Sequence, residues 1–212
     1  MSGIARAVSG GLVLNILRFF LCSAFVGLAV KIMDDWLDGG AGVARPASDK
    51  SNLAGNLGAA SLPYAMLALV CGALFAPETA AGLFLCSYAL GMAWGAGRDH
   101  YPSGLTGWQE SALALLISLA GCGFRVTAVC GLCMAAVQGL DDAIDYRTLG
   151  PSSAPFARRL GLVETVLASS GILMLAFAVD LARTAGAVLG AVFVWVLEGF
   201  FNSRYWGFGE AE

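Results

Sequence analysis

The stretch that decides the fold is FFLCSAFVGLAVKIMDDWLD, residues 19–38. Most of this stretch belongs to an apolar segment, 11–36. The segment is long enough to cross a bilayer, since a helix needs roughly 20 residues to do so. The last residues of the stretch turn acidic and contain three aspartates. We therefore expect a membrane helix that ends in a cluster of carboxylates.

The composition extends this expectation to the whole chain. The 212 residues are 58% hydrophobic and 13% charged, whereas an ordinary soluble domain has about 25% charged residues. This composition excludes a disordered chain, a collagen-like repeat and a secreted disulfide scaffold. The net charge of −3, without a basic stripe, argues against nucleic acid as a partner. We expect one membrane-embedded domain, residues 1–212, surrounded by the lipid bilayer.

Seven apolar segments of helix length follow one another along the chain. They are continuous runs, unlike the alternating strands of about ten residues in a transmembrane barrel. The predicted fold class is therefore all-α, a polytopic transmembrane helical bundle of about seven helices. The segments are 11–36, 60–76, 79–97, 109–123, 125–144, 161–180 and 183–203. The short junctions at 76–77 and 121–125 predict antiparallel hairpins.

Small residues give two further expectations. Gly91 with Gly95, and Gly186 with Gly190, have the G-x-x-x-G spacing that lets helix backbones approach closely in a membrane. Because the chain has 28 glycines, a chance spacing is an equal alternative. The six cysteines all lie in apolar runs, and we interpret them as small buried hydrophobic residues.

The polar connections predict the orientation in the membrane. Long polar stretches, 39–61, 98–108 and 146–160, follow the first, third and fifth segments. The face that they share carries seven basic residues: Arg45, Lys50, Arg98, Arg147, Arg158, Arg159 and Arg204. The opposite face carries three: Arg6, Arg125 and Arg183. The positive-inside rule then predicts an integral protein of the cell (inner) membrane whose long-loop face is cytoplasmic.

Two acidic motifs on that face carry the predicted chemistry. The pattern D-D-x-x-D occurs at the end of the first segment and again at the end of the fifth. Its members are Asp34, Asp35, Asp38, Asp141, Asp142 and Asp145, six of the nine aspartates in the chain. On a helix, residues three or four apart share a face, so like charges are brought together. Solvated helix ends are the plain alternative, but a helix C-terminus disfavours negative charge.

The charge excess of the motifs predicts a metal site. Each cluster has three carboxylates and one nearby cation, Lys31 in the first and Arg147 in the second. Mg²⁺ prefers oxygen ligands and commonly bridges to the phosphates of a substrate. We therefore expect the six aspartates to act as catalytic Mg²⁺ ligands. We expect Lys31, Arg98, Arg147 and Arg204 to bind a diphosphate, although such basic residues also occur simply as flanks of membrane helices.

The two motifs and the helix count resemble the UbiA superfamily of intramembrane prenyltransferases. In that family, motifs of this kind close the second and sixth of nine helices and hold Mg²⁺ that binds an isoprenyl diphosphate. Here they close the first and fifth segments, with the same separation of four helices. The resemblance implies a UbiA-like core without the first and last spans, and transfer of a prenyl group to an unknown acceptor. The family's N-D-x-x-D-x-x-x-D pattern is incomplete here, since neither the asparagine before Asp34 nor an aspartate four residues after Asp38 is present.

Three alternatives stay open. A terpene-synthase-like enzyme would use the same motifs. The sequence Asp35-x-x-Asp38-Gly39, followed by Ala44-Arg45, partly resembles the motif of the CDP-alcohol phosphotransferases. A non-enzymatic divalent-cation transporter would also use acidic residues, but it would favour positions near the middle of the membrane over the helix ends seen here.

Overall fold

The computed structural model describes residues 2–38, 57–95, 103–148, 150 and 154–206, and this part of the chain is helical without a strand. Its long helices are α1 (Ser2–Asp38), α3 (Ser61–Phe75), α4 (Pro77–Gly95), α5 (Gly107–Cys122), α6 (Phe124–Thr148), α8 (Leu162–Val179) and α9 (Leu181–Trp206). A 3₁₀ turn, η1 (Gly58–Ala60), precedes α3, and a short helix, α7 (Pro155–Leu160), precedes α8. The all-α class is confirmed, and each predicted segment contains one long helix.

Several of these helices are compatible with an integral membrane protein. Five are long and apolar enough to cross a bilayer: α1, α3, α6, α8 and α9. Large apolar side chains lie on the outside of the bundle, with Leu74 79% exposed and Phe124 78% exposed. In water such a surface would be unfavourable, whereas in a bilayer it contacts lipid tails. The count of seven membrane spans stays a prediction.

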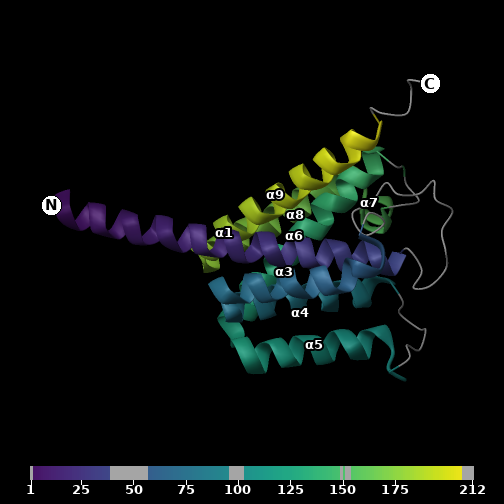
Figure 1. Ribbon diagram of the computed structural model, residues 1–212, viewed down its shortest axis with the longest axis horizontal. Helices are drawn as coiled ribbons and strands as arrows, with labels where there is room; N and C mark the ends of the chain where they lie inside the picture. The colour runs from purple at the N-terminus through teal and green to yellow at the C-terminus, as the bar shows by residue number, and fades with distance from the viewer. Residues whose placement is uncertain (1, 39–56, 96–102, 149, 151–153, 207–212) are drawn as a thin grey trace.

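The helices are divided where proline, glycine or a capping side chain interrupts the apolar run. Pro77 begins α4 directly after α3, a position where its missing N–H costs nothing. Gly123 has a φ of +80° between α5 and α6, a conformation that other residues avoid. Between α8 and α9, the Asp180 carboxylate accepts a hydrogen bond from the backbone N–H of Arg183 at 3.1 Å. The two predicted hairpins, α3 with α4 and α5 with α6, are both present (Figure 1).

The bundle is held by close packing of α1 against α3 and α9, and of α6 against α4 and α8 (Figure 1). The tightest approach uses the second glycine pair. A Cβ on Gly186 would lie 2.7 Å from the backbone carbon of Phe19, and one on Gly190 would lie 2.8 Å from the backbone nitrogen of Ala24. Only glycine allows this approach of α9 to α1. A Cβ on Gly91 would meet nothing within 4 Å, so the first pair does not mark such a contact there.

The direction of the helices gathers the acidic residues at one end. The chain reverses at each hairpin, so α1, α4, α6 and α9 all end on the same side of the bundle (Figure 1). Both D-D-x-x-D motifs are therefore at the same end, as predicted. Four of the six cysteines are buried as predicted, Cys22, Cys86, Cys130 and Cys133, whereas Cys71 and Cys122 are partly exposed, and all six are free thiols.

Candidate functional site

A cavity of about 130 Å³ lies between α1, α4, α6 and α9. Its walls are largely apolar and include Val26, Val30, Met134 and Val194. Four charged side chains also line it: Lys31, Asp34, Asp141 and Glu198. Asp34 belongs to the first D-D-x-x-D motif and Asp141 to the second, so the fold brings one member of each motif to a shared cavity.

The cavity is polar at one end and mostly apolar along its length. On α1 its lining runs from Ser23 to Asp34, and on α9 from Ala187 to Glu198. Eleven residues of helix correspond to roughly 16 Å at about 1.5 Å per residue. Because α1 and α9 end on the same side of the bundle, their charged residues meet at one end, while Ser23 and Ala187 lie at the other. Such a cavity has the shape and polarity of an amphiphile with a charged head.

Lys31 lies at the centre of the charged end. Its Nζ is 3.4 Å from Asp35 Oδ1 in the next turn of α1 and 3.0 Å from Glu198 Oε1 on α9. Asp141 and Asp145 of α6 also interact electrostatically with Lys31. Among the described residues that line the cavity, Lys31 is the single cation. Carboxylates from α1, α6 and α9 thus lie around one ammonium group, and the described lining of the cavity holds three carboxylates and one cation.

The second motif is divided between two environments. Asp141 lines the cavity, and its Oδ1 accepts a hydrogen bond from Trp195 Nε1 at 3.1 Å. Asp142 lies next to it on the helix, about 100° around the axis, and faces elsewhere. Its Oδ2 accepts a hydrogen bond from the backbone N–H of Phe156 at 2.7 Å. That N–H belongs to the first turn of α7, where backbone donors lack helical partners, so Asp142 caps α7.

The first motif is also divided. Asp34 lines the cavity, while Asp35 pairs with Lys31. Asp38 ends α1, and its side chain lies outside the described residues. The five aspartates whose side chains are described therefore lie in different surroundings: Asp34 and Asp141 line the cavity, Asp35 and Asp145 interact with its lysine, and Asp142 caps a helix.

The predicted diphosphate-binding residues are spread more widely. Lys31 lies in the cavity. Arg147 is exposed and lines a different groove, between α6 and α8. Arg98 and the side chain of Arg204 lie outside the described residues. Of the two residues whose side chains the structure describes, Lys31 lies at the acidic end of the cavity and Arg147 does not.

Glu198 and Trp195 are site residues that the predicted ligand sets did not include. They share one face of α9 with Ala187 and Ala191, at spacings of three, four or seven residues. This periodicity was present in the sequence. However, the packing of α9 on α1 decides that this face points to the cavity, and no local pattern encodes that packing.

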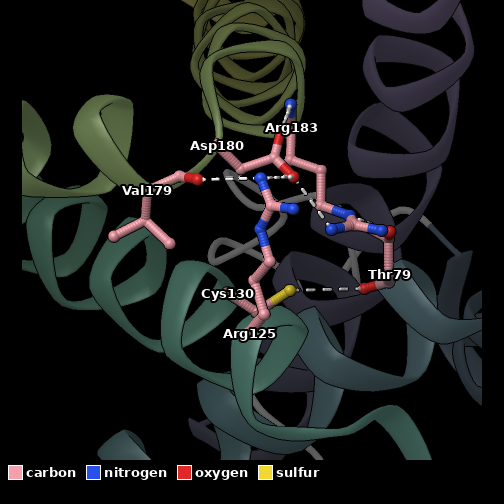
Figure 2. A network of polar contacts seen from close by, with 6 residues as sticks. All are labelled: Thr79, Arg125, Cys130, Val179, Asp180 and Arg183. Carbon is pink, nitrogen blue, oxygen red and sulfur yellow. Dashed lines mark hydrogen bonds and ion pairs between the residues drawn. The ribbon is translucent and has the colours of Figure 1, made fainter.

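A second polar region lies at the opposite end of the bundle and is shown in Figure 2. Arg183 Nη1 is 3.0 Å from Asp180 Oδ2, and Arg183 Nε donates to Thr79 Oγ1 at 3.1 Å. Arg125 Nη2 donates to the carbonyl oxygen of Val179 at 3.1 Å and lies 3.7 Å from Asp180 Oδ2. Cys130 Sγ contacts the carbonyl oxygen of Thr79 at 3.8 Å. These contacts, the Arg–Asp network, join α4, α6, α8 and α9.

The donor chemistry at the acidic end suits a hard divalent cation. Carboxylate oxygens from α1, α6 and α9 are the ligand type that Mg²⁺ prefers. As the side chains stand, no group of three or more His, Cys, Asp or Glu within the described ranges is close enough together to hold a metal ion. A bound cation would therefore draw these carboxylates closer together than they lie here.

Comparisons with known protein families, with curated proteins and with solved structures gave no match to this chain. The functional argument accordingly rests on the residues of the chain and on their geometry.

Proposed function

We propose that this protein is a Mg²⁺-dependent intramembrane prenyltransferase of the UbiA-like type. It binds an isoprenyl diphosphate between the two D-D-x-x-D motifs and transfers the prenyl group to an acceptor. One observation carries the proposal: Asp34 and Asp141, which are 107 residues apart in the chain, line the charged end of a cavity with apolar walls. In this proposal all seven long helices span the membrane, and the motifs face the cytoplasm.

The polarity of the cavity matches the two parts of an isoprenyl diphosphate. The prenyl chain lies along the apolar walls, beside Val26, Val30 and Met134. The diphosphate lies at the charged end, where Lys31 donates to its oxygens. The described lining holds three carboxylates and one cation, so further positive charge there would favour a bound diphosphate. Mg²⁺ supplies that charge when bound, with Asp34, Asp35, Asp141 and Asp145 as the candidate ligands.

The chain's own residues hold the reacting groups and keep water away. Glu198 fixes the position of Lys31 through the 3.0 Å ion pair, and Trp195 orients Asp141 through its indole N–H. In the transfer, the bond between the allylic carbon and the diphosphate oxygen breaks, and its electron pair leaves with the oxygen. The acceptor's nucleophilic atom forms the new bond to that carbon and releases a proton. The apolar walls exclude water, which would otherwise capture the allylic cation.

The direct test is pyrophosphate release from radiolabelled farnesyl or geranylgeranyl diphosphate by the purified protein with Mg²⁺. We expect Asp34→Asn and Asp141→Asn each to lower the rate at least tenfold, roughly the effect of losing one charged contact to the reacting headgroup. Glu78→Gln is the matched control, because Glu78 is an acid in the first turn of α4, at the opposite end.

Three results would overturn the proposal. The first is a rate of pyrophosphate release that Asp34→Asn and Asp141→Asn leave unchanged. The second is release of CMP from a CDP-alcohol, which would indicate a phosphotransferase. The third is flux of divalent cations into liposomes without any cleavage of diphosphate, which would indicate a transporter.

A further inference from the structure

A second hollow lies on the outer surface of the bundle, between α6 and α8, and we name it the α6–α8 groove. Its volume is about 450 Å³, and apolar side chains such as Ile144, Val163 and Leu167 form its sides. These three side chains are between 46% and 66% exposed. The groove therefore opens outward, where a membrane protein meets lipid tails.

The groove has one charged end. Among the described residues that line it, Arg147 alone is charged. Leu140, Ile144 and Arg147 lie at spacings of four and three residues, so they follow one face of α6 toward its C-terminus. The positive end of the groove is therefore at the same end of the bundle as the acidic end of the cavity. An elongated apolar surface with an arginine at one end complements an amphiphile with an anionic head.

Trp195 connects the groove to the cavity. Its side chain lines both of them, and its indole N–H donates to Asp141 on the cavity side. The indole is thus a shared wall between an apolar groove with a basic end and an apolar cavity with an acidic end. A ligand in the groove would therefore contact a residue that also lines the cavity.

We propose that the α6–α8 groove binds one chain of a membrane amphiphile whose phosphate headgroup has a net negative charge, and that Arg147 binds the phosphate. Arginine suits this role because its planar guanidinium can make two parallel hydrogen bonds to phosphate oxygens. In the proposed transfer reaction, this amphiphile is the acceptor, held beside the cavity at Trp195. The acceptor role rests on the proposed function, whereas binding in the groove does not.

Quenching of Trp195 fluorescence by brominated lipid chains tests the binding. The other four tryptophans, Trp36, Trp94, Trp108 and Trp206, are replaced by phenylalanine. The protein is placed in phosphatidylcholine nanodiscs without Mg²⁺ or diphosphate. We expect dibromo-phosphatidylglycerol to quench Trp195 at about fivefold lower mole fraction than dibromo-phosphatidylcholine, the effect of one charge-assisted contact. Arg147→Gln should remove this preference, and Val166→Phe, which fills the groove, should weaken quenching by both lipids.

The matched control is Arg158→Gln, because Arg158 is an exposed arginine on the neighbouring α7 that does not line the groove. It should keep the preference. Equal quenching by the two lipids, or loss of preference in both arginine variants, would overturn the assignment. If the variant with four tryptophans replaced does not fold, native mass spectrometry of the chain with all five tryptophans is used instead. It compares how much phosphatidylglycerol and how much phosphatidylcholine the protein retains. Pyrophosphate release is measured in a separate assay. If no diphosphate is cleaved, the lipid-binding result can still be interpreted.

Discussion

The two polar regions of the bundle differ in how their charges are matched. In the Arg–Asp network, two arginines meet one aspartate, and carbonyl and hydroxyl oxygens accept the remaining hydrogen bonds (Figure 2). At the acidic end of the cavity, carboxylates from three helices surround a single lysine. The first region has one more cation than anions, and its arginine donors find acceptors within the fold, whereas the described lining of the second has three carboxylates and one cation.

This difference separates a region that stabilises the fold from the region that we propose to bind the substrate. Charged groups in a low-dielectric environment are stabilised only when they have well-placed partners. The Arg–Asp network meets this condition and joins four helices where the chain turns. The acidic end adjoins a cavity, and its described lining has three carboxylates and one ammonium group. Excess charge beside a cavity is unfavourable for the empty protein, but it suits binding of a cationic group or of a metal with its substrate.

The largest expected effect comes from breaking the Arg–Asp network. Arg183→Met removes the closest cation from Asp180 and the donor to Thr79. Among the described cations, Asp180 then keeps Arg125, at 3.7 Å. We expect a loss of about 3 kcal/mol in the free energy of unfolding, measured by titration with sodium dodecyl sulfate in mixed micelles. Pyrophosphate release per folded molecule should not change, because the network is at the opposite end of the bundle from the acidic end of the cavity.

Arg125→Met is the control for this prediction. The Arg125 side chain is 69% exposed, against 18% for Arg183. An exposed ion pair contributes at most about 1 kcal/mol. Equal losses in the two variants would mean that burial does not distinguish the two arginines, and the comparison between the two regions would lose its basis.

A smaller effect is expected from removing the lysine at the acidic end. Lys31→Met leaves Asp35 and Glu198 without their shared cation, so like charges on α1 and α9 repel each other. We expect a loss of about 2 kcal/mol in the absence of divalent cations, because the pair is only partly exposed. Millimolar Mg²⁺ should raise the melting temperature of this variant more than that of the wild type, since the cation takes over the charge balance.

Lys31→Arg is the matched variant, and it should melt like the wild type with or without Mg²⁺. If Mg²⁺ raises the melting temperature of Lys31→Met and of the wild type equally, the carboxylates do not act together on one cation. The interpretation of the acidic end as a site for one shared cation would then be wrong.

The sequence predicted those features that local patterns determine. Apolar runs give helices because a helix satisfies its own backbone hydrogen bonds, and each of the seven segments contains one. The alternation of helix direction placed both D-D-x-x-D motifs at the same end of the bundle. The close approach at Gly186 and Gly190 also followed from spacing alone, although the same spacing at Gly91 gave no such contact.

The site itself depended on packing that spacing does not determine. Adjacent aspartates are about 100° apart around a helix, so the rotation of α6 decides which of Asp141 and Asp142 faces the cavity. That rotation is set by contacts with α4 and α8 and by the position of α7. Glu198 and Trp195 reach the site because α9 packs on α1 at its glycines. These contacts join residues far apart in the chain, and no local motif predicts them.

The smallest expected effect separates the two neighbouring aspartates of the second motif. Asp142→Ala removes the carboxylate that accepts from the backbone N–H of Phe156, so α7 loses a cap. Loss of a cap costs about 1 kcal/mol, which a titration of unfolding detects. Pyrophosphate release per folded molecule should stay within about twofold of wild type, whereas Asp141→Ala should lower it at least tenfold, as expected for Asp141→Asn, because Asp141 lines the cavity.

If the two variants lose activity equally, both carboxylates serve the ligand. Capping of α7 would then not explain the position of Asp142, and the division of the second motif would be wrong.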